Sequence, residues 1–511
     1  MNVESFLSHH GIRENPFNAE EARHDPVFAR LDPAVASHPD LAKILGHLDR
    51  PATSIVFGEK GSGKTAIRLT VGDRVKDHNE RSPQRRVLLI PYDDLNPFLD
   101  RLYQRSGGKL DETLRRLRLA DHQDAILSLA VTQVVDALLE GNGSTAARDL
   151  RKQARKAPRR QRADLAVIAG LYDQPRGGSV VSRYRQLAKA LKLGPRFGAP
   201  GLKVLGIVLT VVALVALVGV LAARPEPMWL YYSGVALVGG AALLAWGAFA
   251  LRQVRGYLRF RHVARDTPAV SRSTGELMAT LGQLHPADLE HQPLPGAPGS
   301  SRGGDGPALD SDSRYHLTRK LLDAIEPLGF HALMVLMDRV DEPTLISGDP
   351  GRMRAVVWPL LDNKFLQQER VAVILLLPAE LRYLLARESG DFYQHARLDK
   401  QHLIDRLTWS GATLYDLCSA RLQACRTADP QAIGLTDLFE EGVTKDLIID
   451  ALDQMHQPRD AFKFMYAVIQ EHCRTVPQDQ PVFRIPRLTL ETIRRAQSQR
   501  VQELARGLSP A

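Results

Sequence analysis

Four short apolar runs alternate along the chain with longer segments in which apolar residues recur at helical spacing. The runs occupy residues 53–57, 86–91, 332–337 and 371–377, and each is almost continuous in Val, Ile, Leu, Met or Thr. Strands that are apolar throughout are typical of parallel sheets covered by helices on both faces. The pattern therefore predicts an α/β fold built on a parallel sheet.

Two longer stretches, 204–223 and 228–251, carry no charged residue. Each meets the length of about 20 apolar residues that a membrane-spanning helix requires. The Arg-Pro-Glu-Pro turn at 224–227 separates them, and Lys and Arg flank their outer ends. Under the positive-inside rule, both long arms face the cytosol. The pattern predicts a transmembrane hairpin in the inner (cytoplasmic) membrane, a multi-pass chain with both termini and the α/β core in the cytosol.

Small residues within the second stretch, Ala236 and Gly240, allow a close approach of helices. This approach serves either packing within the hairpin or a homo-oligomer, and the sequence leaves the choice open.

The hairpin interrupts the α/β pattern, so the chain divides into seven parts. The expected divisions are an N-terminal segment of loops and short helices at 1–50, the first part of the core at 51–105, a helical insertion with a basic run at 106–200, the hairpin at 201–255, a helical segment with a flexible Pro/Gly/Ser-rich linker at 256–313, the second part of the core at 314–399, and an all-helical C-terminal part at 400–511.

Composition changes this picture in one place. The 511 residues include 67 basic and 58 acidic side chains, a net charge of +9, with 44% hydrophobic residues. These ordinary values exclude a disordered or collagen-like chain, and three cysteines are too few for a disulfide framework. The basic excess is concentrated at 148–162. That run fits contact with anionic lipid, a solvated helix face or nucleic-acid binding, and the neighbouring hairpin favours lipid over nucleic acid.

Candidate chemistry begins directly after the first apolar run. The sequence there is Gly58, Glu59, Lys60, Gly61, Ser62, Gly63, Lys64 and Thr65. This matches the P-loop pattern in its strand–loop–helix setting. Glycines let backbone N–H groups surround phosphate oxygens, Lys64 meets the β- and γ-phosphates, and the Thr65 hydroxyl ligates Mg²⁺. The motif predicts binding of ATP with Mg²⁺.

A P-loop site needs a second acid for the metal at the end of an apolar strand. Asp338 follows the run 332–337 and fills that role. The residue directly after it is Arg339, so the carboxylate that activates water is displaced or absent. Asp341 and Glu342 are equal candidates.

A P-loop, an inserted hairpin and an apolar strand ending in Asp338 and Asp341 together resemble the KAP family of membrane-associated P-loop NTPases, which are STAND/AAA+-like. The resemblance implies an NTPase core with a C-terminal helical lid, in signalling or antiviral-defence settings. In related ATPases a Pro-Arg pair at the start of a lid helix touches the γ-phosphate, which implies that role for Arg459. An arginine acting from a neighbouring subunit is a further option, with Arg387, Arg397 and Arg406 in the expected region.

These observations predict a membrane-anchored ATPase that hydrolyses Mg-ATP to drive a conformational or assembly switch. A nucleotide-dependent scaffold that does not hydrolyse ATP, and a defence ATPase linked to nucleic acid, remain as alternatives. The chain has no guanine-selective N-K-x-D pattern after the fourth run, which favours ATP over GTP.

Overall fold

The computed structural model describes every residue of the chain except 20–21, 32–36, 140–144, 176, 194–198, 224–225, 271, 285–287, 290–293, 296–311, 428–433 and 506–511. Most of the linker expected at 286–313, and the first half of the turn at 224–227, lie outside the described residues.

The centre of the molecule is a five-stranded sheet in which every pairing is parallel. Its strands are β1 (Ser54–Gly58), β2 (Arg86–Tyr92), β3 (Phe330–Met337), β4 (Val371–Pro378) and β5 (His402–Ile404), in the order β2-β3-β4-β1-β5. All four strands expected from the sequence are present, and the α/β fold with a parallel sheet is confirmed.

The fifth strand corrects one expectation. The chain was expected to be helical from residue 400 onward, but His402–Ile404 pairs in parallel with β1 through Ser54, Ile55 and Val56. A strand of three residues is too short to show a periodic pattern, and its conformation comes from the neighbouring strand instead. The sheet therefore extends into the segment assigned to the helical C-terminal part.

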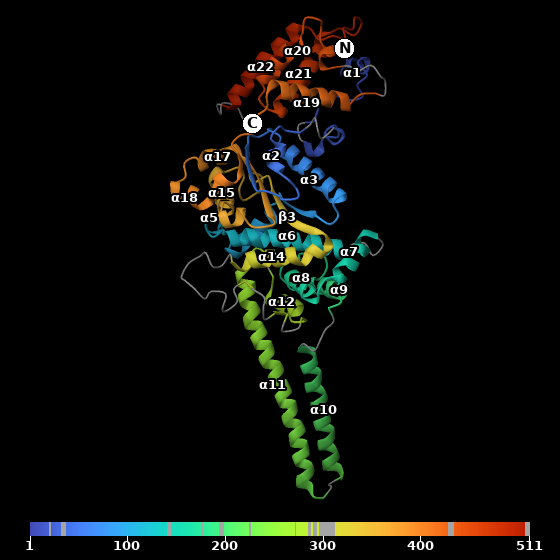
Figure 1. Cartoon of the computed structure of the whole chain (residues 1–511), viewed down its shortest axis with the longest axis vertical. Coiled ribbons are helices and arrows are strands. Elements are labelled where there is room, and N and C mark those ends of the chain that lie inside the picture. Colours follow the sequence, from blue (N-terminus) through green and yellow to red (C-terminus); the bar gives the residue numbers. More distant parts are fainter. Residues whose placement is uncertain are drawn as a thin grey trace.

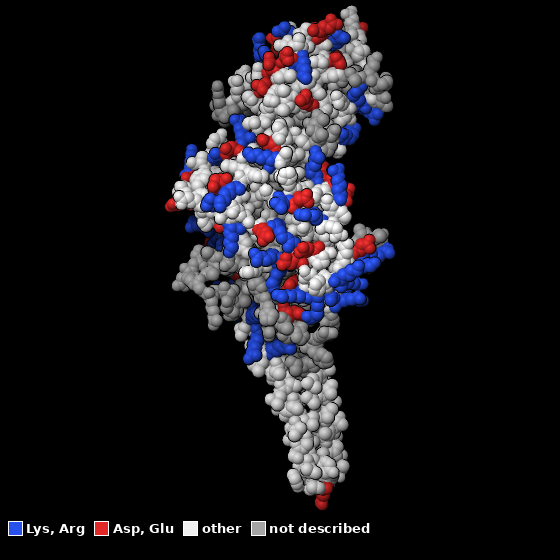
Figure 2. Space-filling model, in the orientation of Figure 1, with Lys and Arg blue, Asp and Glu red and all other residues white. Residues whose placement is uncertain are grey.

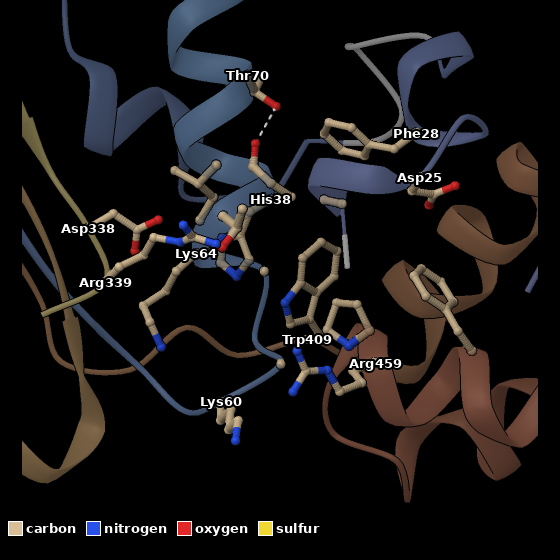
Figure 3. Close-up of a pocket in the computed structure, with 18 of the residues that line it drawn as sticks. Asp25, Phe28, His38, Lys60, Lys64, Thr70, Asp338, Arg339, Trp409 and Arg459 are labelled. Atoms are coloured by element: carbon tan, nitrogen blue, oxygen red, sulfur yellow. Dashed lines mark hydrogen bonds between the residues drawn. The ribbon is translucent and has the colours of Figure 1, made fainter. Parts of the chain in front are cut away.

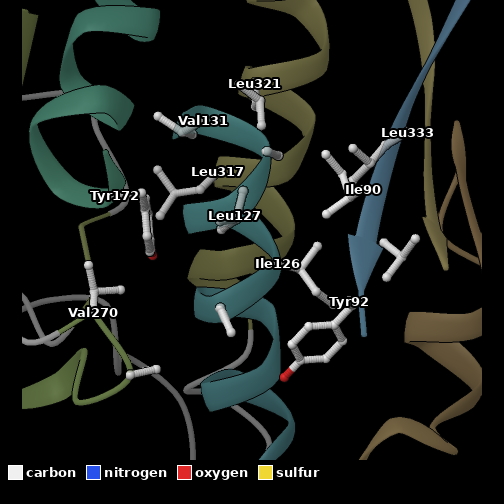
Figure 4. Close-up of a cluster of buried hydrophobic side chains, with 14 of the residues drawn as sticks. Ile90, Tyr92, Ile126, Leu127, Val131, Tyr172, Val270, Leu317, Leu321 and Leu333 are labelled. Atoms are coloured by element: carbon white, nitrogen blue, oxygen red, sulfur yellow. The ribbon is translucent and has the colours of Figure 1, made fainter. Parts of the chain in front are cut away.

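Helices cover both faces of the sheet (Figure 1). On one face, α2 (Leu41–Leu45) and α3 (Lys64–Arg81) pack against Val56, Leu336 and Ile374. On the other face lie α6 (Leu119–Leu139) and α14 (Asp312–Ile325), with α8 (Arg159–Tyr172) beneath them. Figure 4 shows Ile126 of α6 directed toward Ile90 and Tyr92 of β2. Successive side chains of each strand point to opposite sides of the sheet, so both faces carry apolar side chains. The helices on each side bury them.

The remaining helices of the central body surround these layers. They are α4 (Asn96–Arg105), α5 (Leu110–Arg115), α7 (Thr145–Lys156), α9 (Val180–Ala190), α12 (Thr274–Leu281), α15 (Pro350–Val357), α16 (Asn363–Leu366), α17 (Ala379–Leu385) and α18 (Gly390–Ala396).

The C-terminal part forms a separate helical bundle with its own apolar core. Its helices are α19 (Gly411–Ala424), α20 (Lys445–Asp453), α21 (Pro458–Thr475) and α22 (Arg487–Ala505). The first helix of the chain, α1 (Val3–His9), packs into the same core through Phe6 and Leu7. The amino group of Met1 donates a hydrogen bond to the carbonyl of Cys473 at 3.1 Å. The N-terminus is therefore part of the C-terminal bundle.

Two helices extend from the opposite end of the body as an antiparallel pair (Figure 1). They are α10 (Ala199–Ala223) and α11 (Met228–Asp266), and both are long and apolar enough to cross a membrane. Only 11% of the apolar window in each is buried. The indole N–H of Trp246 donates to Thr210 Oγ1 at 3.2 Å and joins the two helices. Figure 2 shows a shaft without charged residues apart from its tip, with Lys and Arg gathered where it meets the body.

The basic run at 148–162 lies on α7 and the start of α8. Four of its arginines donate to nearby groups of the body. Arg151 bonds the carbonyls of Leu138 and Leu139, Arg155 and Arg162 bond those of Ala190 and Leu191, and Arg159 forms a paired contact with Asp288. Lys152, Lys156 and Arg160 are exposed. Much of the run therefore ties helix ends together, a structural role that was not among the interpretations made from the sequence.

Candidate functional site

The loop between β1 and α3 is a tight turn that glycine makes possible. Gly61 and Gly63 have φ angles of 95° and 96°, in the left-handed region that disfavours other residues. Gly63 caps the N-terminus of α3, which begins at Lys64. The helix N-terminus and its free backbone N–H groups therefore face the concave side of this loop, an arrangement suited to an anion.

Lys64 lies folded over the loop. Its ammonium donates to the carbonyls of Gly58 at 2.5 Å and Glu59 at 3.0 Å. Burial lowers the pKa of Lys64, and the charges of Asp338 and Asp341 oppose that shift. Lys64, Asp338 and Asp341 all line one cavity.

Asp338 is buried at the carboxyl end of β3, with only 2% of its surface exposed. Burial raises its pKa, and the backbone N–H of Arg339 and the charge of Arg68 oppose the rise. Arg68 of α3 has its Nε 3.3 Å from Asp338 Oδ2 and its Nη1 2.5 Å from Asp93 Oδ2. The Arg68–Asp338 contact is an ion pair without hydrogen-bond alignment, so Asp338 Oδ2 has no hydrogen-bond partner in the described structure. An oxygen in this state suits a cation.

The two candidate bases lie in different surroundings. Asp341 lines the cavity in front of Lys64 and is among the charges that act on it. Glu342 also lines the cavity, but its side chain is 54% exposed and its Oε1 lies 3.2 Å from Arg339 Nε. Glu380, two residues beyond the end of β4, lines the cavity as well and its charge acts on Lys64. The cavity therefore holds three carboxylates, of which Asp341 and Glu380 act on Lys64 and Glu342 is paired with Arg339.

The C-terminal bundle closes over the loop. Arg459, the second residue of α21, packs so near Gly61 that a side chain at Gly61 would meet Arg459 Cβ at 3.0 Å. Glu59 accepts a hydrogen bond from Gln457 and pairs with Arg406 Nη2 at 2.7 Å. Arg459 lines the cavity, whereas Arg387, Arg397 and Arg406 do not. Of the four arginines singled out from the sequence, Arg459 is the one brought to the cavity.

A cavity of about 340 Å³ connects the loop with the N-terminal segment and the bundle. Its lining includes three aromatic side chains, Phe28, Trp409 and Phe462, and the buried ion pair of Asp25 and Arg421. Figure 3 shows Phe28 and Asp25 on the side of the cavity away from Asp338 and Lys64. Trp409 donates its indole N–H to the Ser62 carbonyl at 2.9 Å, and its ring meets the ring of His38 edge-on at 4.8 Å between centroids. The cavity thus joins the glycine loop to a region whose lining includes aromatic side chains.

The described residues contain no group of three or more His, Cys, Asp or Glu arranged to hold a metal ion. Mg²⁺ does not need such a cage, since it is usually held by one or two carboxylates together with substrate phosphates and water. Thr65 and Asp338 both line the cavity, and Asp338 Oδ2, which has an ion pair with Arg68 but no hydrogen bond in the described structure, fits this role.

Several cavity residues were not expected from the sequence. Glu380 could have been found by the argument that identified Asp338, because it also follows an apolar strand. Trp409, His38 and Phe28 carry no local signal, since they reach the cavity through tertiary packing of segments distant in the chain.

Comparison of the chain with protein-family models, with curated proteins and with solved structures gives no match. The functional argument therefore rests on the geometry of the site.

Proposed function

We propose that the protein is a membrane-anchored P-loop ATPase that binds Mg-ATP and hydrolyses it to drive a conformational or assembly switch. The observation that carries the proposal is the arrangement of one cavity. The left-handed glycine loop and Lys64 form one wall, and the buried Asp338 at the end of β3 forms the facing wall. The C-terminal bundle, with Arg459, closes the third side.

The shape of the cavity matches the parts of a nucleotide. The loop and the start of α3 would bind the phosphates through backbone N–H groups, and Lys64 would meet the β- and γ-phosphates. The aromatic end, with Phe28, Trp409 and Phe462, would hold the flat base. Both ends are needed for a nucleoside triphosphate, and an inorganic phosphate would use only the first.

Each polar residue then has a role in hydrolysis. Thr65 and Asp338 would hold Mg²⁺, which supplies positive charge to the phosphate oxygens. Asp341 would orient the attacking water and accept its proton, because it lines the cavity and its charge acts on Lys64. Arg459 would bind the γ-phosphate from the lid, and so couple the nucleotide to the position of the C-terminal bundle.

The test is phosphate release by the full-length protein, purified in detergent, with Mg-ATP. Lys64→Ala should abolish turnover, and Asp341→Asn should lower kcat by about 10²-fold or more. Glu342→Gln, one CH2 group longer and also in the cavity, tests the competing base. A larger loss of kcat in Glu342→Gln than in Asp341→Asn would make Glu342 the base in place of Asp341. A parent that binds no ATP would refute the proposal. A parent that binds ATP without turnover would favour the nucleotide-dependent scaffold.

We propose also that α10 and α11 span the inner membrane, with the body in the cytosol. Exposed apolar residues such as Leu237 at 75% and Leu244 at 76% are unfavourable in water and suit lipid. The basic residues Arg252, Arg255 and Lys203 at the body end support this topology. A reporter fused between Glu226 and Pro227 should report the outer side, and a cytosolic signal there would contradict the topology.

A further inference from the structure

The residue that directly follows Asp338 has an unusual backbone. Arg339 has φ 61°, one of few non-glycine residues in the left-handed region among those the structure describes. Its carbonyl accepts a hydrogen bond from the N–H of Glu342 at 3.2 Å. A strained backbone held by its surroundings is a frequent feature of functional sites. The sharp turn keeps the Arg339 side chain at the cavity.

The guanidinium of Arg339 lies at the phosphate end of that cavity. Figure 3 shows Arg339 next to Asp338 and Lys64, and it lines the cavity with both. Its side chain is 21% exposed, and its Nε has no aligned hydrogen bond in the described structure. Its ion pair is with Glu342, which is itself 54% exposed. Most of its hydrogen-bonding capacity is therefore unused by the protein.

A second arginine separates a structural role from a functional one. Arg370 has nearly the same backbone, with φ 62°, and directly precedes β4, at the opposite end of the parallel strands from Arg339. Its Nε donates to the His331 carbonyl at 2.8 Å and its Nη1 to Asp323 at 3.0 Å. The guanidinium of Arg370 is thus used to hold the fold together. Arg339 has the same strain without comparable partners.

We propose that Arg339 is a catalytic residue that contacts the transferred phosphoryl group from within the same chain. The proposal rests on the proposed ATPase function. In hydrolysis, water forms a bond to the γ-phosphorus, and the bond to the bridging oxygen breaks with its electron pair leaving on ADP. The water proton passes to a cavity carboxylate and then to solvent, which gives ADP, phosphate and a proton. Negative charge grows on the phosphoryl and bridging oxygens during this step.

An arginine is suited to that charge because its planar fork can donate two parallel hydrogen bonds to phosphate oxygens. Arg459 is carried by the lid, whereas Arg339 is carried by the central sheet, next to the end of β3. Arg339 therefore keeps its place relative to Lys64 whatever the position of the C-terminal bundle. This role would remove the need for an arginine from a neighbouring subunit.

The experiment compares Arg339→Ala, Arg339→Lys and Arg370→Ala in the full-length protein in detergent. Arg339→Ala should lower kcat by about 10³-fold or more. Its affinity for a fluorescent ATP analogue should change little. Arg339→Lys should recover only part of the rate, because it keeps the charge but lacks the fork. Arg370→Ala likewise puts alanine at a residue with a positive φ. It should lower thermal stability, while kcat of the folded protein stays near the parent value.

A second measurement reports the transition state without turnover. The parent should bind ADP more tightly with aluminium fluoride, a mimic of the transferring phosphoryl group, than without it. Arg339→Ala should lose this difference while binding ADP normally. If Arg339→Ala keeps kcat within tenfold of the parent, or keeps the aluminium fluoride effect, the Arg339 proposal is wrong. A parent that hydrolyses ATP while Arg339→Ala hydrolyses it equally well overturns the Arg339 proposal alone. A parent that binds ATP but never hydrolyses it, or that binds no nucleotide, overturns the proposed ATPase function as well.

Discussion

Arg314, in α14, is the side chain whose loss should destabilise the central body most. It is completely buried and bonds two acids on other helices. Its Nε and Nη2 donate to the two oxygens of Asp124 in α6, at 3.1 and 3.0 Å. Its Nη1 and Nη2 donate to the side chain and carbonyl of Asp266, the last residue of α11, at 2.8 and 2.7 Å. One guanidinium therefore joins three helices of the layer beneath the sheet.

Replacing Arg314 with Leu would leave Asp124 completely buried with the Tyr172 hydroxyl, at 2.7 Å, as its remaining partner shown here. Removing one partner of a buried ion pair costs about 3–5 kcal/mol, because the other charge stays out of water. At roughly 2–4 °C per kcal/mol, the melting temperature should fall by about 6–20 °C.

The measurement is thermal unfolding of the detergent-solubilised protein, followed by tryptophan fluorescence. Arg159 provides the matched control, since it also donates two hydrogen bonds to one carboxylate, Asp288, at 2.8 and 3.0 Å, but is 50% exposed. Arg159→Leu should cost about 0–1 kcal/mol. The double variant with Arg314→Leu and Asp124→Leu should recover much of the loss. The reasoning is refuted if Arg314→Leu is no more harmful than Arg159→Leu.

Three further predictions concern the loop, the core and the lid. Gly61→Ala should lower ATP affinity and destabilise the protein by about 1–3 kcal/mol, because Gly61 has a positive φ and its added Cβ would press on Arg459. Gly72→Ala in α3, where the added Cβ meets open space, is the control and should be neutral or slightly stabilising. Equal effects of the two substitutions in an ATP-binding assay would contradict the prediction. Burial lowers the pKa of His122 to about 4. The stability that the neutral ring contributes is therefore present above pH 6.5 and is lost as the pH falls toward 4, by up to about 3 kcal/mol. The free energy of unfolding of His122→Gln should depend less on pH across that window than that of the parent. Glu59→Gln should loosen the bundle by weakening the Arg406 contact, measured as faster proteolysis near residue 410, and unchanged cleavage would count against it.

The strands and the loop could be predicted because their signals are local. Each long strand is a continuous apolar run, and the glycine loop follows the first one directly. The strand β5 could not be predicted, because three residues of ordinary composition take their conformation from β1. The packing of α1 into the C-terminal bundle was also missed, since it depends on contacts such as Met1 with Cys473 across nearly the whole chain.

Some residues of the candidate site could likewise be predicted from local signals in the sequence, and others could not. Lys64 and Asp338 were predicted because both follow apolar strands, and the carboxyl ends of parallel strands meet at one edge of a sheet. The choice between Asp341 and Glu342 could not be made from the sequence, since it depends on which carboxylate is paired with Arg339. The contribution of Trp409 was also invisible, because its hydrogen bond to Ser62 joins residues far apart in the chain.

The place of the hairpin in the chain follows from the geometry of the sheet. β2 and β3 are adjacent and parallel, so a long crossover must connect them in any case. The hairpin is inserted in that crossover, on the face covered by α6, α8 and α14, and it leaves every strand pairing intact (Figure 1). The crossover returns through α14 to β3, which ends at Asp338. Because Arg314 fastens the end of α11 to α14, the hairpin is joined to the segment that positions Asp338, while the cavity itself opens at the other end of the body, beneath the C-terminal bundle.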